Sequence, residues 1–331
     1  MTIRDNWILL KEKVRLRVYQ NPFFNGSELS KEVIKSFKLK GVQRVFHGNP
    51  DALVILTREQ IIKIPLGDFS LQRCQNNKQI LNELKNTSIA SFVPKFLEEG
   101  TINDQAYFIE SKLPGIAIDV SISKMDYMVE KAADFITQFH KKTAKEVLVN
   151  ETVFKNLVSC DFELLCSFLT SEYSDKLKQV ESNLKGQLIG KKLKTVWFHG
   201  DYKIENVLFD TKTWEISGLI DWDLSIQQGL PLLDVLYLLL YKESLFTRAP
   251  IIEILKKRIN SGFNKDEIII MQNYKNALAI NDDGFSSLLC LFWINHIVKR
   301  FQSIFVYKSQ DRAQWIQLNV NAVIDAFLET Q

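Results

Sequence analysis

The sequence has little of what marks several large classes of protein. Its four cysteines show no C-x-x-C spacing, and its four histidines are widely dispersed, so neither a disulfide-stapled scaffold nor a zinc site is indicated. No apolar run is long enough to span a bilayer, and the N-terminal segment carries charges throughout instead of the apolar core of a signal peptide. We therefore expect a cytoplasmic protein without membrane insertion.

The charge balance and several missing motifs narrow the choice further. The formal net charge is only +3, and the clusters of Lys and Arg are short, so we expect no nucleic-acid partner. The patterns GxxxxGK[ST], GxSxG and HExxH are absent, which excludes P-loop nucleotide hydrolases, α/β-hydrolases with a serine elbow and zincin proteases. A length of 331 residues predicts two domains or one large two-lobed unit.

Residues 42 to 110 have the composition of a small antiparallel sheet. Short β-rich runs are separated by turn residues, and one helical stretch, 71–85, stands between the third and fourth run. The expected strands are 42–46, 52–56, 61–64, 96–102 and 106–110. Leu113-Pro114-Gly115 then breaks the pattern and marks a joint.

Beyond the joint the apolar residues recur mostly with helical spacing. One β-hairpin, 206–210 and 216–221, interrupts the helices. The expected helices are 123–143, 153–184, 231–241, 250–262, 264–279, 284–306 and 312–329. The pattern therefore predicts an α+β fold with a boundary near residue 113: a lobe over 1–113, including a helical extension over 1–40, and a mostly helical lobe over 114–331.

The segment from His199 to Asn206 contains H-G-D-x-x-x-x-N and runs into an expected strand. Phosphoryl transfer needs a carboxylate to orient the attacking hydroxyl and accept its proton, and a neutral oxygen ligand to hold the metal at the phosphates. Asp201 suits the first role and Asn206 the second. We interpret His199 as a support of the loop, because the chemistry already has its base.

Twenty residues after Asp201 the chain reads Leu-Ile-Asp221-Trp-Asp223. An aspartate at the end of an apolar strand supplies the hard carboxylate oxygens that Mg²⁺ prefers. Asp221 is the expected principal metal ligand. Asp223 is either an auxiliary ligand or an exposed aspartate in a turn.

These motifs, together with Leu230-Pro231-Leu232-Leu233-Asp234, resemble the aminoglycoside phosphotransferase/choline kinase family over roughly residues 42 to 300. The resemblance implies a bilobal protein-kinase-like fold with a small nucleotide-binding N-lobe and a catalytic, substrate-binding C-lobe. It also implies a catalytic base at Asp201, Mg²⁺ held by Asn206 and Asp221, and a loop support at Asp234. Another histidine, His140, matches a packed helix of the family, and we interpret it as structural.

Two features of the first lobe have alternative explanations. Lys63 lies in an apolar strand, where it is either an edge residue with its head in water or the ligand of the nucleotide phosphates; the downstream motifs favour the second. Gly48 and Asn49 stand where a phosphate-covering loop belongs, although an ordinary hairpin turn explains them almost as well.

The resemblance also places an interlobe linker at Glu110, Ser111, Lys112 and Leu113, where exposed backbone groups would pair with the adenine edge. One departure concerns the inserted helix, where family members carry a glutamate that pairs with the strand lysine and this chain has Asn77. Either a neighbour such as Glu83 compensates, or nucleotide affinity is lowered.

Only nine residues separate Asp221 from Pro231, which leaves no room for the segment on which protein kinases seat a peptide. We therefore expect ATP (or GTP) and Mg²⁺ as cofactors and a small-molecule hydroxyl as acceptor, on a sugar, amino alcohol, antibiotic or biosynthetic intermediate. The alternative is a nucleotide-binding pseudokinase or scaffold without turnover. Nothing in the sequence indicates the oligomeric state.

Overall fold

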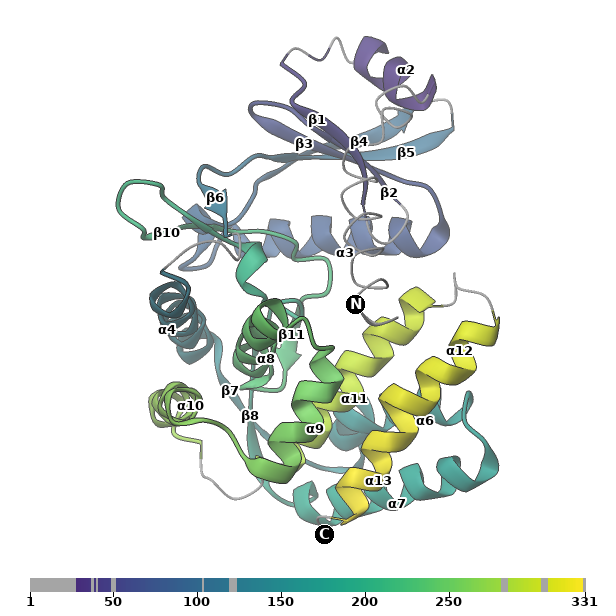
Figure 1. Ribbon diagram of the computed structural model, residues 1–331. Coiled ribbons are helices and arrows are strands. Elements are labelled where there is room, and N and C mark those ends of the chain that lie inside the picture. The colour runs from purple at the N-terminus through teal and green to yellow at the C-terminus, as the bar shows by residue number, and fades with distance from the viewer. Residues whose placement is uncertain are drawn as a thin grey trace. The chain divides into compact units, whose positions relative to one another are not determined.

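The computed structural model describes residues 28–36, 39, 41–48, 52–102, 104–118, 124–280, 285–304 and 309–329 (Figure 1). The chain forms two compact units, each with its own packing. The first lies within Met1–Asp119 and Glu205–Ser225, and the second within Val120–Ile204 and Ile226–Gln331.

A five-stranded antiparallel sheet is the centre of the first unit, with strand order β1-β2-β3-β5-β4. Its strands are β1 (Arg44–Gly48), β2 (Ala52–Leu56), β3 (Gln60–Pro65), β4 (Phe96–Ile102) and β5 (Gln105–Ser111). Side chains alternate between the faces of a strand, so Ile62 and Ile64 of β3 enter the core while Lys63 points to the other face. The core contains Val33, Val45, Leu53, Ile55, Ile62, Ile64, Tyr107 and Ile109.

Helix α3 (Asp68–Leu84) contacts β3, β4 and β5. Its buried positions recur every three or four residues, which puts one stripe of the helix against the sheet. That stripe includes Cys74 and Asn77 as well as the aliphatic residues Ile80, Leu81 and Leu84. Helix α2 (Glu28–Ser36) supplies Val33 to the core.

A second, three-stranded sheet belongs to the same unit, with strand order β10-β9-β6. It joins β6 (Ile116–Ala117) to β9 (Val207–Phe209) and β10 (Ile216–Leu219). Gly115 precedes β6 with φ +106°, and a Cβ atom there would lie 2.8 Å from the carbonyl oxygen of Phe209. Only glycine fits this close approach, which ties the segment before β6 to the hairpin after Asn206.

The second unit is mostly helical. Its helices are α4 (Met125–Thr143), α5 (Glu151–Phe154), α6 (Cys160–Cys166), α7 (Ser171–Leu188), α8 (Leu233–Thr247), α9 (Ile251–Ser261), α10 (Lys265–Leu278), α11 (Phe285–Ile304), α12 (Ser309–Ile316) and α13 (Ala322–Glu329). A small sheet of β7 (Lys145–Leu148), β8 (Lys192–Phe198) and β11 (Ile226–Gly229) has the order β11-β8-β7. Strand β8 leads into the H-G-D motif.

The expected α+β fold class, with an antiparallel N-terminal sheet and a helical remainder, is confirmed. All five predicted strands and the inserted helix are present. The expected helix 153–184 is instead divided, because the chain leaves helical geometry between α6 and α7. Of the extension over 1–40, the residues before 28 lie outside the described ones.

The packing units differ from the expected division at residue 113. Residues up to 119 pack with the first unit, and 205–225 join it because β9 pairs with β6. The assignment of nucleotide-binding and catalytic roles to 1–113 and 114–331 stays a prediction.

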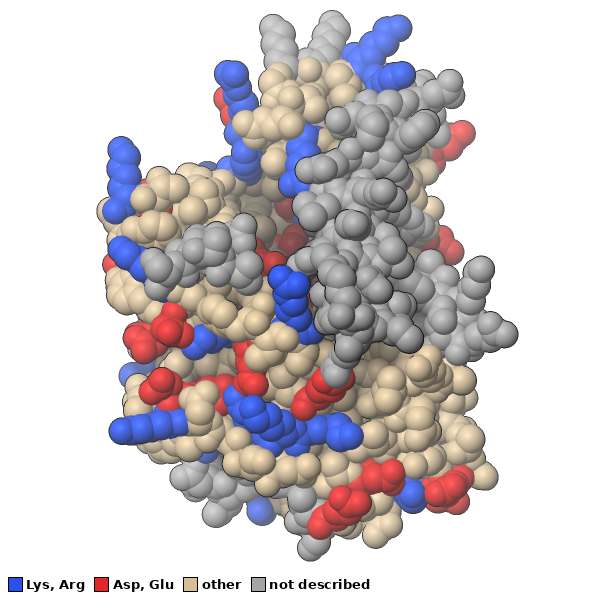
Figure 2. Space-filling model, in the orientation of Figure 1, with Lys and Arg blue, Asp and Glu red and all other residues tan. Residues whose placement is uncertain are grey.

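Lys, Arg, Asp and Glu side chains are interspersed on the face shown in Figure 2, as the small net charge suggests. Among the described helices, none is both long enough and apolar enough to cross a bilayer.

Candidate active site

The predicted base lies in the second unit, directly after β8. Asp201 has a side-chain exposure of 20%, and its Oδ2 lies 3.1 Å from Nζ of Lys203. The backbone N–H of Asp201 donates a hydrogen bond to Nδ1 of His199 at 3.3 Å. A carboxylate held beside a lysine is an ordered acceptor for a hydroxyl proton, and the lysine adds positive charge next to it.

Asp234 holds the loop that carries Asp201. Its carboxylate accepts the backbone N–H of His199 at 2.7 Å and that of Gly200 at 3.0 Å. The side chain is fully buried in the first turn of α8. Two charge-assisted hydrogen bonds from successive peptide groups therefore define the backbone immediately before the base. Gly200 has φ +85°, which suits glycine at this turn.

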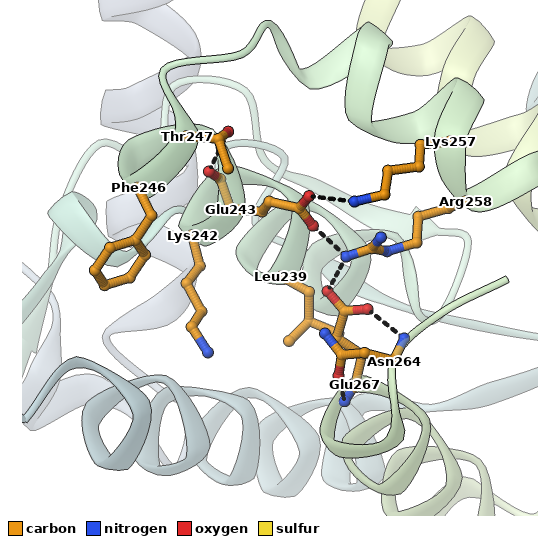
Figure 3. Close-up of a pocket in the computed structure, with 9 residues that line it drawn as sticks. All are labelled: Leu239, Lys242, Glu243, Phe246, Thr247, Lys257, Arg258, Asn264 and Glu267. Carbon is orange, nitrogen blue, oxygen red and sulfur yellow. Dashed lines mark hydrogen bonds and ion pairs between the residues drawn. The ribbon is translucent and has the colours of Figure 1, made fainter. Parts of the chain in front are cut away.

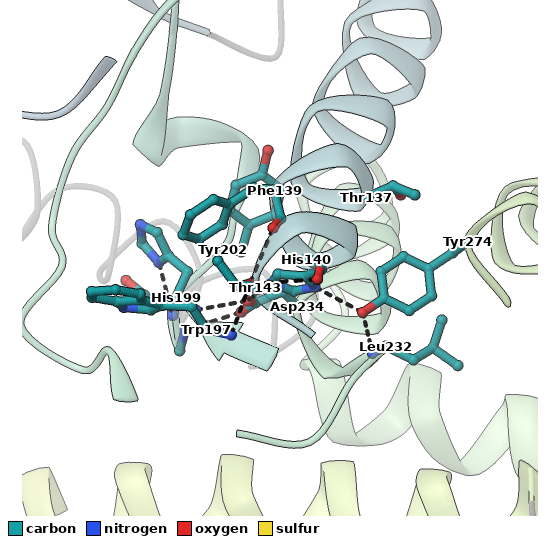
Figure 4. A network of polar contacts seen from close by, with 12 residues as sticks. Thr137, Phe139, His140, Thr143, Trp197, His199, Tyr202, Leu232, Asp234 and Tyr274 are labelled. Carbon is teal, nitrogen blue, oxygen red and sulfur yellow. Dashed lines mark hydrogen bonds and ion pairs between the residues drawn. The ribbon is translucent and has the colours of Figure 1, made fainter. Parts of the chain in front are cut away.

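A buried polar network lies behind this loop (Figure 4). The hydroxyl of Tyr274 accepts the N–H of Leu232 at 3.0 Å and lies 2.7 Å from Nδ1 of His140. We assign the phenol of Tyr274 as the donor and Nδ1 of His140 as the acceptor, so the N–H of the imidazole is at Nε2. Nε2 lies 3.3 Å from Oδ2 of Asp234 without hydrogen-bond geometry. Burial raises the pKa of Tyr274 far above its usual range, so the phenol keeps its proton.

The predicted metal ligands lie in the first unit. The chain passes from the second unit to the first between Ile204 and Glu205, just before Asn206. The N–H of Ile220 donates to the carbonyl oxygen of Asn206 at 3.0 Å, so the residue before Asp221 is tied to Asn206 through the backbone. Asp221 has φ +63°, a left-handed conformation that is uncommon for aspartate and that occurs preferentially at functional sites.

The amide oxygen of Asn206 and the carboxylate of Asp221 are the kinds of oxygen donor that Mg²⁺ prefers. The carboxylate of Asp221 is 48% exposed, whereas Asn206 is buried. The described residues contain no group of three or more His, Cys, Asp or Glu that would enclose a metal by itself. Mg²⁺ is commonly held by one or two carboxylates together with waters and substrate phosphates, so this sparse donor set is suitable.

Lys63 lies between two carboxylates of the first unit. Its Nζ is 3.0 Å from Oε1 of Glu110 and 3.6 Å from Oδ1 of Asp221. Burial alone would lower the pKa of Lys63, but Glu110, Asp221 and Asp223 outweigh it and raise the pKa, so the ammonium stays charged. The lysine therefore lies beside the predicted metal ligand and is not an edge residue with its head in water.

Asn77 contacts the same glutamate. Its Nδ2 donates to Oε2 of Glu110 at 2.8 Å, and both side chains are buried. Glu83, the example we gave of a neighbour that could compensate, accepts a hydrogen bond from Gln79 on the exposed side of α3. The inner stripe of α3 contains position 77 and not position 83, so the acid beside Lys63 is Glu110, and the alternative of a lowered nucleotide affinity stays a prediction.

Asp223 is not an exposed turn residue, because its side chain is only 19% exposed, and the alternative of an auxiliary metal ligand stays a prediction. Its Oδ2 accepts from Nε of Arg73 at 2.7 Å and lies 2.7 Å from the Nη2 atom of the same guanidinium. The Nδ2 group of Asn76 donates to the backbone carbonyl oxygen of Asp223 at 2.8 Å. Helix α3 thereby anchors the loop that follows Asp221.

Two of the backbone N–H groups of the predicted interlobe linker are already hydrogen-bonded within the protein. The backbone N–H of Ser111 donates to the carbonyl oxygen of Lys95, and that of Lys112 to the carbonyl oxygen of Glu59. Neither N–H is available for a nucleobase. Within the described part of the chain, the N–H of Leu113 has no hydrogen-bond partner, and the pairing of the linker with a nucleobase stays a prediction.

The turn expected to cover the phosphates begins at Gly48. Gly48 is the last residue of β1 and is paired with Ala52 of β2. Asn49 lies outside the described residues. The role of this turn stays a prediction.

A pocket of about 340 Å³ lies elsewhere in the second unit, between α8, α9 and α10 (Figure 3). None of the predicted site residues lines it. Its buried Arg258 contacts the carboxylates of Glu243 and Glu267, the latter at 2.9 Å, and Lys257 lies 3.6 Å from Glu243. These ion pairs join side chains of α8, α9 and α10, so the charged residues of this pocket connect the three helices.

Comparison with known proteins defines the class. The fold and the ordered motifs are those of a phosphotransferase that modifies a hydroxyl group. The phosphotransferase enzyme family matches residues 48–261, more than half of the chain, and the chain belongs to this family. A search of curated proteins gives no match.

Solved structures agree on the fold. The aminoglycoside phosphotransferase APH(3'')-Id from Streptomyces rimosus, in complex with ADP and streptomycin, is 14% identical with TM-score 0.52, over 82% of this chain and 98% of that one. ADP-bound APH(2'')-Ib is 17% identical with TM-score 0.53, over 92% and 97%. A GDP and kanamycin complex of APH(2")-IIIa is 12% identical with TM-score 0.54, over 91% and 98%. The predicted protein-kinase-like fold is thereby confirmed.

Sequence reasoning missed several residues around the site. Lys203 stands two positions after Asp201, and that spacing is a signal that could have identified it. Lys299 donates to the carbonyl oxygen of Gly200 at 2.9 Å and covers the ring of Phe198, with its Nζ 4.4 Å from the ring centroid. A contact between residues so far apart in the chain leaves no local signal.

Proposed function

We propose that this phosphotransferase transfers the γ-phosphate of ATP or GTP to a hydroxyl group of a small molecule, with Mg²⁺ bound by Asn206 and Asp221. The observation that carries the proposal is Lys63 at 3.6 Å from Asp221, because a phosphate-binding cation and a metal-binding carboxylate must lie side by side in such a site. When bound, Mg²⁺ neutralises the charge of the phosphates.

The remaining roles follow from the chain's own side chains. Asp201 orients the acceptor hydroxyl and takes its proton while the acceptor oxygen attacks the γ-phosphorus and the nucleoside diphosphate leaves. Lys63 binds the phosphates, and Lys203 supplies positive charge beside the base. Asp234 and His199 hold the loop, and the N–H of Leu113 donates to the nucleobase.

The acceptor is a small molecule of modest charge. Two lysines, Lys203 and Lys299, flank the loop of Asp201, and they disfavour a polycation at this position. The ring of Tyr241 lies 5.9 Å from Nζ of Lys203 and 5.9 Å from the tilted ring of Tyr237, so aromatic side chains lie close to the base. A hydroxyl on a sugar, an amino alcohol or a biosynthetic intermediate fits these surroundings better than a polycationic antibiotic.

The test is acceptor-dependent release of ADP or GDP in the presence of Mg²⁺. The panel holds neutral sugars, amino alcohols, streptomycin and kanamycin, and the variant Asp201→Asn accompanies the wild type. With a true acceptor, the variant should turn over about 10²- to 10⁴-fold more slowly and still bind nucleotide. Equal rates in both proteins would remove Asp201 from the role of base, whereas nucleotide binding without any transfer would favour the scaffold.

A further inference from the structure

The partner of Lys63 comes from a neighbouring strand and not from helix α3. Glu110 of β5 is paired with Ile61 of β3, and Lys63 with Phe108. Residues two apart on a strand share a face, so Glu110 and Lys63 are diagonal neighbours on one side of the sheet, within reach of long side chains. The distance of 3.0 Å between Nζ and Oε1 shows that the pair is formed.

Both oxygens of this carboxylate are engaged. Lys63 contacts Oε1, and Nδ2 of Asn77 donates to Oε2 at 2.8 Å. The side chain of Glu110 is 6% exposed and that of Lys63 is 16% exposed, so little solvent screens the pair. Helix α3 therefore contributes a neutral amide that orients the acid, while the negative charge belongs to the sheet.

We propose that Glu110 is the positioning residue for Lys63 in nucleotide binding, so that the negative charge beside the lysine comes from β5, while helix α3 contributes only the neutral amide of Asn77. The inference rests on the proposed function, in which Lys63 binds the nucleotide phosphates. An ammonium group has three donors, and Glu110 occupies one of them with hydrogen-bond distance. Asp221 lies 3.6 Å from the same nitrogen, so the lysine stands next to the carboxylate at which the phosphates are expected.

The experiment measures the dissociation constants of MgADP and of adenosine by calorimetry. Adenosine lacks phosphates, so its binding reports the contacts of the base and the ribose without those of the phosphates. Glu110→Gln keeps the shape of the side chain and removes its charge; we expect MgADP binding to weaken roughly 10- to 100-fold with adenosine binding unchanged. Asn77→Ala should weaken MgADP binding clearly less than Glu110→Gln does.

The matched control is Glu99→Gln, which makes the same change in an exposed pair between Glu99 of β4 and Lys78 of α3. It should leave both dissociation constants unchanged. The proposal is overturned if Glu110→Gln binds MgADP like the wild type, or if Asn77→Ala has the larger effect.

A double variant keeps the test decisive should Glu110→Gln fold poorly. Lys63→Met combined with Glu110→Gln removes both buried charges together, which avoids an unpaired charge. If Glu110 acts through Lys63, the double variant binds MgADP no more weakly than Lys63→Met alone. A further loss in the double variant, beyond that of Lys63→Met, would show an independent role for Glu110. If the wild type bound MgADP no more tightly than adenosine, Lys63 would not bind the phosphates, and the proposed function of Lys63 would be wrong. That result differs from one in which the wild type gains affinity from the phosphates but Glu110→Gln has no effect.

Discussion

Asp234→Asn is the substitution that tests the support of the catalytic loop most sharply. The aspartate accepts two backbone N–H groups, from His199 and Gly200, and is fully buried. Asparagine has the same shape but only one acceptor oxygen. One N–H group must therefore face an amide NH₂ group, and the hydrogen bond that survives loses its charge assistance.

The magnitude follows from these two losses. A buried donor without a partner costs about 1–3 kcal/mol, and a charge-assisted hydrogen bond is roughly twice as strong as a neutral one. We expect a loss of about 2–3 kcal/mol in the free energy of unfolding, or a fall in Tm of about 4–12 °C. Turnover should fall as well, because the backbone before Asp201 is no longer held. Stabilisation by MgADP should persist, since Lys63 and Asp221 belong to the first unit.

Urea unfolding followed by circular dichroism, with a turnover assay alongside, measures both effects. The matched control is Asp266→Asn, which makes the same change in the first turn of α10 at an exposed position. Loss of a favourable helix-dipole interaction there costs only about 0.3–1 kcal/mol. If the two variants had equal stability and turnover, Asp234 would not support the loop.

Two further substitutions test the second unit. Arg258→Met leaves the buried carboxylate of Glu267 without its cation and the part-buried Glu243 with Lys257 alone, and it should cost roughly 3–5 kcal/mol in urea unfolding. Lys257→Met, at a side chain 64% exposed, should change stability by less than about 0.5 kcal/mol, and equal effects would show that Arg258 does not join these helices. Burial raises the pKa of Asp161, partly offset by Lys299, so the folded state disfavours the charged carboxylate, and Asp161→Asn should be more stable than wild type at pH 7. That gain should vanish as the pH falls below the ordinary aspartate value of 3.8, and a gain independent of pH would contradict the assignment.

The residues that could be predicted from the sequence are those in short, ordered motifs. The spacing of Asp201 and Asn206, and the strand that ends at Asp221, are local patterns, because the loop and the hairpin that carry them are continuous in the chain. The apolar strand around Lys63 is likewise a local pattern, and it placed the lysine within the predicted sheet. The five strands and the inserted helix were predictable for the same reason, since their periodicity is local.

The partners of these residues were not predictable in the same way. The acid beside Lys63 was sought on helix α3, but the pairing register of β3 and β5 supplies it from Glu110. That register is a relation between strands more than forty residues apart. The contact between Arg73 and Asp223 spans 150 residues and is equally invisible in either local segment. Short strands such as β6 and β11 were missed because their extended conformation depends on pairing with β9 and β8.

The most direct test of the central claim is a thermal-shift measurement with ATP and with GTP, each with and without Mg²⁺, on the wild type and on Asp221→Ala. We expect the nucleotide to raise the Tm of the wild type, with a part of the rise that depends on Mg²⁺ and that disappears in the variant. Nucleotide at one hundred times its Kd would stabilise the protein by about 2.7 kcal/mol. A wild type whose Tm does not respond to either nucleotide at millimolar concentration, with or without Mg²⁺, would contradict the account.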